Sequence, residues 1–204
     1  MEGAGKTTQA RLFADWLGEV GISHRLGREP GGTPLGEAIR GVLLDSRGPG
    51  MSAESELLLM LAARAAFVRE VVRPTLESGA VMVADRFELS TFAYQGVGRG
   101  LGVEEVERLN RFATSGLRAD VTMVLDVPAS LGQARQREGR KERDRIEAEG
   151  VSFLEVVRAA YRSLARDHPG AVLLDASPSV DEVHRQVREV LITRFPEHFS
   201  SRRG

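Results

Sequence analysis

Short apolar runs alternate along the chain with longer segments of helical periodicity. The runs lie at 80–84, 121–125 and 171–174, with a weaker one at 23–26. Runs of this length predict strands, and their alternation with helices predicts a mainly parallel central sheet flanked by helices. All but the run at 23–26 are continuously apolar, which is typical of strands buried on both faces. The pattern therefore predicts an α/β fold.

Helices are expected in the intervening segments. We place them from Lys6 to Val20, through 39–44, from Ser52 towards Pro74, over 103–115 and over 180–195. Gly21 can adopt the left-handed conformation that ends a helix, Ser52 can cap one, and Pro74 predicts a kink or an end. Residues 57–61 are apolar almost all round, so this helix is expected to be buried or to contact a partner. Neither a repeat nor a linker divides the chain, so 1–204 is expected to be a single domain.

The composition excludes several classes of protein. The 204 residues carry 28 Lys+Arg and 29 Asp+Glu, a net charge of −1, which argues against wholesale binding to nucleic acid or to a membrane surface. Cysteine is absent, which excludes disulfides, thiolate metal sites and thiol nucleophiles. No window approaches the roughly 18 apolar residues of a membrane span. We expect a cytoplasmic globular protein whose anion-binding site is local.

The residues Gly3-Ala4-Gly5-Lys6-Thr7-Thr8 match the second half of the phosphate-binding loop G-x-x-x-x-G-K-[ST]. Small residues let successive backbone N–H groups face a triphosphate, and the following helix adds its positive end. Lys6 is then expected to reach the β- and γ-phosphates, and the Thr7 hydroxyl to bind Mg²⁺. A Gly-rich terminus that only caps a helix is the alternative.

The match lacks its first half. The leading Gly of the motif falls one residue before Met1, and the sequence contains no strand that feeds the loop. We expect the functional protein to carry about ten further residues, ending in Gly, before Met1.

Asp85-Arg86-Phe87 follows directly on the apolar run at 80–84. Ligands bind at the carboxyl ends of parallel strands in open α/β sheets. Asp85 is therefore a candidate for holding Mg²⁺ through water, and Arg86 for clamping a phosphate. An ion pair at the end of a strand is the alternative.

Three further segments are candidates for function. Six of the eleven residues from Arg135 to Arg145 are Arg or Lys, which suits a mobile lid at about 135–150 that closes over a transferring phosphoryl group. A solvated helix face is the ordinary alternative. The Gly-rich segments 28–34 and 94–100 are candidate specificity elements, although 30–34 also suits a tight turn before a helix.

Taken in order, six segments resemble the bacterial thymidylate kinases, which are P-loop nucleoside monophosphate kinases. They lie at 2–9, 28–33, 62–64, 85–87, 90–100 and 144–147. The resemblance implies a three-layer P-loop kinase fold and the transfer of the γ-phosphoryl group of ATP to dTMP, with Mg²⁺, to give ADP and dTDP. It also implies a homodimer, for which the helix through 57–67 is a candidate interface.

The resemblance assigns roles residue by residue. Gly3 to Thr8 bind the ATP phosphates, Glu2 accepts a hydrogen bond from the sugar 3′-hydroxyl, and the lid arginines Arg137, Arg140 and Arg145 stabilise the transferring charge. The acceptor nucleotide is assigned to Arg64 and Arg86 at its phosphate, Thr91 and Gln95 at the thymine edge, Tyr94 at the sugar, and Glu29, Arg40, Arg99 and Tyr161 in the surrounding pocket.

One residue departs from the family pattern. Met60 stands where the family usually has a Phe that stacks on thymine, so weaker or altered base stacking is expected. Two other functions stay open at this point. One is a kinase for another nucleoside monophosphate, and the other is a nucleotide-binding module without turnover.

Overall fold

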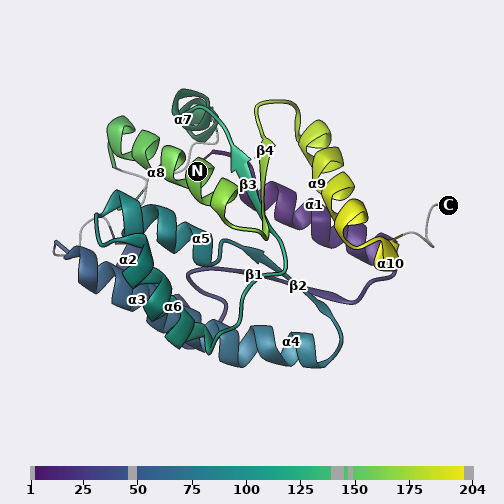
Figure 1. Ribbon diagram of the computed structural model, residues 1–204, viewed down its shortest axis with the longest axis horizontal. Coiled ribbons are helices and arrows are strands. Elements are labelled where there is room, and N and C mark those ends of the chain that lie inside the picture. The colour runs from purple at the N-terminus through teal and green to yellow at the C-terminus, as the bar shows by residue number, and fades with distance from the viewer. Residues whose placement is uncertain (1–2, 46–49, 139–144, 147–148, 200–204) are drawn as a thin grey trace.

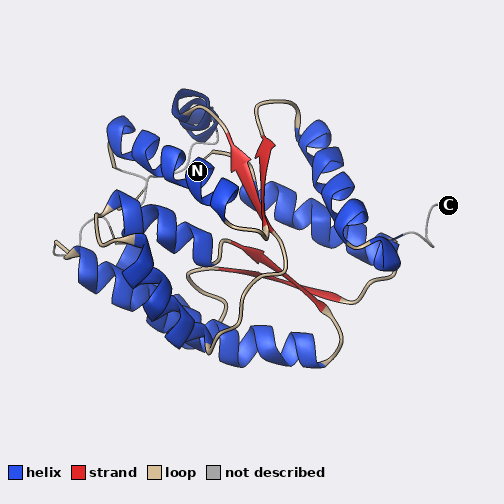
Figure 2. Cartoon of the chain, viewed as in Figure 1, coloured by secondary structure: helices blue, strands red, loops and turns tan. Residues whose placement is uncertain are grey.

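The computed structural model describes residues 3–45, 50–138, 145–146 and 149–199. Helices lie on both sides of short parallel strands (Figures 1 and 2). The strands are β1 (His24–Arg28), β2 (Val81–Asp85), β3 (Thr122–Asp126) and β4 (Ala171–Asp175). All the predicted strands are confirmed, and each ends one or two residues later than expected.

The strands pair in parallel as β1 with β2 and β3 with β4. Leu26 lies opposite Val83 in one pair, and Val124 lies opposite Leu173 in the other. No ladder of hydrogen bonds joins the two pairs within the described residues. Every described strand is thus paired on one edge. The expectation of burial on both faces is wrong in part, because the side chain of Leu173 in β4 is 39% exposed. The expected strand before Met1 stays a prediction.

The longer helices are α1 (Lys6–Glu19), α2 (Pro34–Leu44), α3 (Ala53–Phe67), α6 (Val103–Thr114), α7 (Ala129–Glu138), α8 (Val151–Asp167) and α9 (Val180–Arg194). Helices are confirmed in all five expected segments, and two further long helices, α7 and α8, were not predicted. Ser52 caps α3 by accepting a hydrogen bond from the Ser55 backbone N–H. Gly21 after α1 and Ser115 after α6 have positive φ, the conformation that ends a helix.

Two π-helical segments each adjoin one of the shorter helices. The first, η1 (Val68–Val72), precedes α4 (Arg73–Glu77), so the break expected at Pro74 comes just before it. Pro74 has no N–H to donate to the carbonyl of Glu70, which disfavours regular α-helical bonding there. The second, η2 (Phe92–Gly98), follows α5 (Glu88–Thr91) and contains most of the Gly-rich segment 94–100. A last short helix, α10, spans Pro196–Phe199.

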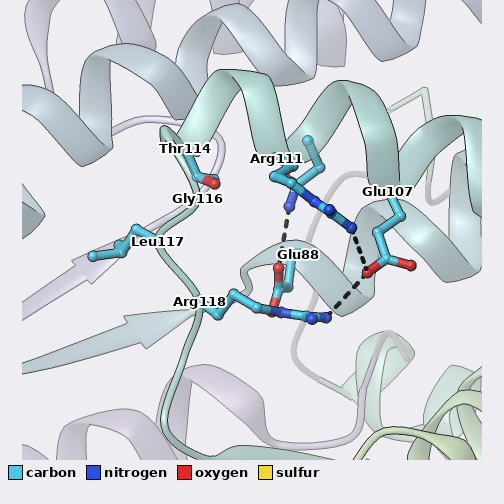
Figure 3. A pocket seen from close by; sticks show the side chains of 8 residues that line it. Glu88, Glu107, Arg111, Thr114, Gly116, Leu117 and Arg118 are labelled. Carbon is cyan, nitrogen blue, oxygen red and sulfur yellow. Dashed lines mark hydrogen bonds and ion pairs between the residues drawn. The ribbon is translucent and has the colours of Figure 1, made fainter.

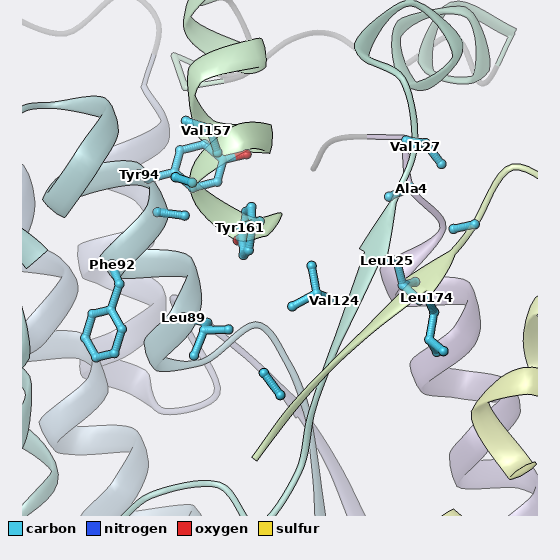
Figure 4. Close-up of a cluster of buried hydrophobic side chains, with 14 of the residues drawn as sticks. Ala4, Leu89, Phe92, Tyr94, Val124, Leu125, Val127, Val157, Tyr161 and Leu174 are labelled. Carbon is cyan, nitrogen blue, oxygen red and sulfur yellow. The ribbon is translucent and has the colours of Figure 1, made fainter. Parts of the chain in front are cut away.

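The main hydrophobic core combines residues of the strands with residues of α8 (Figure 4) and of α1, α3 and α9. Val124 and Leu125 of β3 contribute to it together with Ala4 of the Gly-rich turn, so the core brings this turn beside the strands. The tryptophan Trp16 on α1 is buried, stacked on Phe199 with 4.9 Å between ring centroids. Arg188 lies over the same indole. None of the described helices combines the length and the apolarity needed to cross a bilayer.

Candidate functional site

The Gly-rich turn before α1 has the conformation that its glycines permit. Gly3 and Gly5 have φ values of 67° and 82°, which a side chain disfavours. A Cβ atom on Gly3 would also lie 2.0 Å from the carbonyl oxygen of Gly132 in α7. The Gly5 carbonyl accepts the first hydrogen bond of α1, from Gln9. Lys6 thus starts a helix whose positive end faces the turn, as an anion site requires.

Thr7 and Asp85 meet at the carboxyl end of β2. The Thr7 hydroxyl donates a hydrogen bond to Asp85 Oδ2 over 2.5 Å, although 78 residues separate the two. Asp85 Oδ1 is buried and has no hydrogen-bond partner among the described residues. A hydroxyl and a carboxylate, both of which can bind a metal ion through oxygen, thus lie together beside the Gly-rich turn. The Oδ1 atom of the carboxylate has no hydrogen bond to a described residue. This set fits Mg²⁺, which is typically held by one or two carboxylates together with substrate phosphates.

Arg86 follows Asp85 in a strained backbone conformation. Its φ is 74°, which is uncommon for a residue with a side chain and costs on the order of 1–3 kcal/mol. The guanidinium carbon lies 5.4 Å from the centre of the Tyr94 ring. Such strain persists only where the surrounding structure enforces it, and it is concentrated at functional sites. The conformation therefore supports a binding role for Arg86 over a simple ion pair at the end of a strand.

Arg64 of α3 is almost fully buried in a polar cluster. Its Nε and Nη2 both donate to Glu29 Oε2, over 2.8 and 2.6 Å. Its Nη1 donates to Thr91 Oγ1 and to Asn110 Oδ1, each over 2.9 Å. The ring of Phe87 lies 5.2 Å from the guanidinium carbon. Burial raises the pKa of the Glu29 carboxyl, although Arg64 opposes the shift, and Glu29 Oε1 lacks a partner among the described residues.

Glu56 of α3 gathers a second cluster. Its carboxylate accepts hydrogen bonds from Gln95 Nε2 over 2.7 Å, from Arg145 Nη2 over 2.6 Å and from both Nε and Nη2 of Arg99. Burial alone would raise the pKa of Glu56, but these donors outweigh it, so the pKa lies below its ordinary value. Arg99 also pairs with Glu149 over 2.6 Å. The cluster thus joins the segment after 144 to η2.

The segment after β1 is fixed by α2. Arg40 Nη1 donates to the carbonyl of Pro30 over 3.0 Å. Glu37 accepts from Arg28 Nη2 and from the backbone N–H of Gly32, both over 2.9 Å. Thr33 caps α2 by accepting from the Gly36 N–H. Residues 30–34 thus do form a turn before a helix, and the turn also brings Glu29 to Arg64.

The aromatic residues expected near the nucleoside are buried side by side. The rings of Tyr94 and Tyr161 meet edge to face with 6.2 Å between centroids (Figure 4). Tyr161 also donates a hydrogen bond to Ser90 over 2.9 Å. Met60 of α3 is partly buried against the main core. These contacts leave the predicted roles of Tyr94, Tyr161 and Met60 as predictions.

Some of the predicted site residues lie outside the residues that the structure describes. Glu2 and Arg140 are among the undescribed residues, and so is half of the expected lid at 135–150. Arg137 belongs to α7, but its side chain is not described. Arg135, in the same helix, donates to the carbonyls of Ala176 and Ser177 over 2.8 and 2.9 Å. That part of the cationic run is therefore helical and bound to the loop after β4.

Three of the buried polar residues that hold the clusters were not predicted from the sequence. They are Glu56, Glu88 and Asn110. Asn110 lies four residues after the buried Val106 and four before the buried Thr114, on the inward face of α6. A polar residue on the apolar stripe of an amphipathic helix is a signal that was available. Glu56, close to the start of α3, has the position of an ordinary acidic residue near a helix N-terminus.

A Gly-rich turn with a Gly-Lys-Thr motif at the start of α1, met by the carboxyl end of a parallel strand, defines the class of P-loop α/β proteins. The family model described as "Thymidylate kinase" matches residues 1–187. The chain belongs to the thymidylate kinase family.

Individual relatives agree with the family match. The chain is 47% identical over 191 residues to a thymidylate kinase of Pseudomonas putida, covering 93% of this chain and 90% of the relative. It is 43% identical over 190 residues to a thymidylate kinase of Fervidobacterium nodosum, covering 93% and 94%. Among solved structures, a thymidylate kinase from Ehrlichia chaffeensis superposes with a TM-score of 0.77 at 28% identity, covering 94% of each chain.

Proposed function

We propose that this protein transfers the γ-phosphoryl group of ATP to dTMP, giving ADP and dTDP. The hydrogen bond between Thr7 and Asp85 carries the proposal, because it joins the phosphate-binding turn to the segment that bears the acceptor residues. Relatives named thymidylate kinase, 43–47% identical over at least 90% of both chains, supply the identity of the acceptor. They favour dTMP over another nucleoside monophosphate and turnover over mere binding.

The reaction needs positioning and positive charge more than it needs a base. The attacking oxygen belongs to a phosphate that is already anionic, so no nucleophile has to be generated. The backbone N–H groups of 3–8 and the Lys6 ammonium bind the ATP phosphates and stabilise the charge that moves towards the leaving oxygen. Asp85 and Thr7 would hold Mg²⁺, which when bound neutralises charge between the β- and γ-phosphates.

The acceptor nucleotide is proposed to lie against α3, α5 and η2. Arg86 binds its phosphate, a role supported by the enforced positive φ. Arg64 is also assigned to the phosphate, and it donates a hydrogen bond to Thr91, which is assigned to the thymine edge. The remaining proposed contacts are Glu2, Glu29, Arg40, Met60, Tyr94, Gln95, Arg99 and Tyr161.

Lid arginines complete the site in this proposal. Arg137, Arg140 and Arg145 are proposed to surround the transferring phosphoryl group. Arg145 donates its Nε–H to the Leu43 carbonyl over 2.9 Å and its Nη2–H to Glu56, which supports a place near the acceptor side. An arginine at such a position contributes about 10³–10⁵ to the rate in related phosphoryl transfers.

A panel of nucleoside monophosphates tests the function. Coupled release of ADP is measured with dTMP, dUMP, CMP and AMP, each with Mg²⁺ and with excess EDTA. We expect turnover with dTMP to exceed that with the others, and EDTA to abolish it. Faster turnover of another monophosphate would reassign the substrate. Nucleotide binding without ADP release would make the protein a binding module.

A homodimer is proposed to form through α2, α3 and α6, which lie side by side (Figure 1). These helices expose Val42, Leu58 and Phe112, the last 88% exposed, and such side chains favour association. F112D is expected to shift the protein to monomers in sedimentation. V156D, at an exposed valine of α8, is the matched control. A dimer unchanged by F112D and L58D would place the interface elsewhere.

The near-neutral charge and lack of cysteine support a cytoplasmic enzyme without nucleic-acid partners.

A further inference from the structure

We propose that Asn110, held in turn by Glu88, is a positioning residue that fixes the guanidinium of Arg64 for the acceptor nucleotide. The inference rests on the proposed function, in which Arg64 binds dTMP. Asn110 belongs to α6 and Glu88 to α5, and neither is among the residues assigned above to substrate. Both are buried, with 2% and 1% of their surface exposed.

The guanidinium of Arg64 is almost fully committed to the protein. It has five N–H groups. Two donate to Glu29 and two, both on Nη1, donate to Thr91 and Asn110. The remaining N–H, on Nη2, makes no hydrogen bond to a described residue, so it is the one left for a ligand. Its direction is set by the other four bonds, because the guanidinium is planar.

Asn110 connects this guanidinium to a carboxylate. Its Oδ1 accepts from Arg64 over 2.9 Å, and its Nδ2 donates to Glu88 Oε2 over 3.1 Å. Only a side chain with an acceptor at one end and a donor at the other can make both bonds. Arg64, which can only donate, and Glu88, which accepts here, therefore select the same orientation of the amide. Without Glu88, the amide would lose the acceptor of its N–H group and be held from one end only.

Glu88 is anchored on its other side near the protein surface. Its Oε1 lies 3.6 Å from Arg118 Nε and 3.8 Å from His168 Nε2, and Arg118 also pairs with Glu107 over 3.4 Å (Figure 3). The Arg118 guanidinium compensates the buried carboxylate, as a buried charge requires. A pocket of about 300 Å³ beside it is also lined by Thr114. The chain of contacts thus runs from the surface through Glu88 and Asn110 to Arg64.

The cluster is confined to the acceptor side of the proposed site. It consists of Glu29 before α2, Arg64 of α3, Glu88 and Thr91 of α5, and Asn110 of α6. None of its hydrogen bonds involves the Gly-rich turn at 3–8. A loss of orientation at Arg64 should therefore weaken dTMP binding and leave ATP binding intact. A purely structural role would instead lower stability without this selectivity.

The first test replaces Asn110 by leucine in the full chain. N110L keeps the volume but removes the acceptor, so we expect KM for dTMP to rise about ten- to a hundredfold. KM for ATP should stay within about twofold. T114V is the matched control, because it removes a hydroxyl on the same buried face of α6 that has no partner among the described residues. T114V should leave both KM values unchanged.

The second test reverses the polarity of the amide connection. N110D places a carboxylate against Glu88, and repulsion between the two should raise KM for dTMP at least as much as N110L does. In N110D/E88Q the glutamine amide donates to the new carboxylate at position 110, which still accepts from Arg64. The double variant should recover most of the dTMP affinity. Recovery would not follow from a role limited to filling space.

Three outcomes would overturn the positioning role. They are equal changes in KM for dTMP and ATP, a loss of thermal stability in N110L with both KM values unchanged, and a double variant no better than N110D. Calorimetric dTMP binding to the unsubstituted protein separates this failure from that of the proposed function. If that protein binds no dTMP, both proposals fall. If it phosphorylates dTMP while the variants bind as tightly as it does, only the positioning role falls.

Discussion

K6M is expected to lower kcat for dTMP phosphorylation by about a thousandfold or more, with little change in folding stability. Lys6 is the first residue of α1 and directly follows Gly5, which has a left-handed conformation. At this position the backbone N–H groups and the helix dipole already favour phosphate. The charge of the Lys6 ammonium is proposed to be matched to the charge that develops on the β- and γ-phosphates. A neutral thioether of similar length removes that charge and keeps the helix. Steady-state rates at saturating ATP and dTMP measure the effect.

R11M is the control for K6M. Arg11 lies on the same helix, is exposed and is replaced in the same way, so the net charge changes equally. We expect R11M to keep kcat within about twofold, because an exposed charge is screened by solvent. A K6M variant with the kcat of the unsubstituted protein would contradict the assignment of residues 3–8 to the ATP phosphates.

R64M is expected to destabilise the fold by about 3–5 kcal/mol. Arg64 and Glu29 form an ion pair in which both side chains are at least 96% buried. Removing the cation leaves the Glu29 carboxylate buried without compensation, and it also removes donors from Thr91 and Asn110. Chemical denaturation at neutral pH measures the loss. R28M is the matched control: Arg28 and Glu37 form an ion pair that is about half exposed, so its loss should cost no more than about 1 kcal/mol.

The destabilisation by R64M should depend on pH in a definite direction. Burial raises the pKa of Glu29 above its ordinary 4.5, and Arg64 opposes this shift, so the pKa rises further in the variant. A carboxyl whose pKa is raised by folding is compatible with the fold when protonated and destabilises it as the pH rises through the folded pKa. The loss should therefore be largest at neutral pH and shrink towards pH 4.5. R64M/E29Q should lack this dependence and recover much of the stability.

The elements of the fold could be predicted because they depend on local patterns. The strand β2 is an apolar run, α3 has Ser52 at its cap, and α1 ends before a glycine with φ of 70°. The π-helical turn before Pro74 was less accessible, because Pro74 predicts a break in the helix without specifying its geometry. Burial of the strands was overestimated because an apolar run does not reveal whether a helix covers each face of the strand, as the exposed Leu173 shows.

The candidate site was predicted as a set of residues but not as a set of contacts. Thr7 and Asp85 were both expected near Mg²⁺, and they are hydrogen-bonded. By contrast, Arg64 was considered only as a ligand for substrate, whereas most of its N–H groups bind the protein. Its partners Glu29 and Asn110 lie 35 and 46 residues away, so no local pattern pairs them. Buried polar pairs of this kind depend on how helices pack.

The stacking of Trp16 on Phe199 gives the chain an intrinsic optical reporter. Trp16 is the single tryptophan of the sequence and lies on α1, whose first turn follows the Gly-rich segment. Its indole lies between Phe199 and Arg188 in the folded protein. Unfolding brings it into water, so its emission will shift to longer wavelengths. The stability of the Arg64 and Asn110 variants can thus be followed by fluorescence without attaching a dye to an enzyme that has no cysteine to carry one.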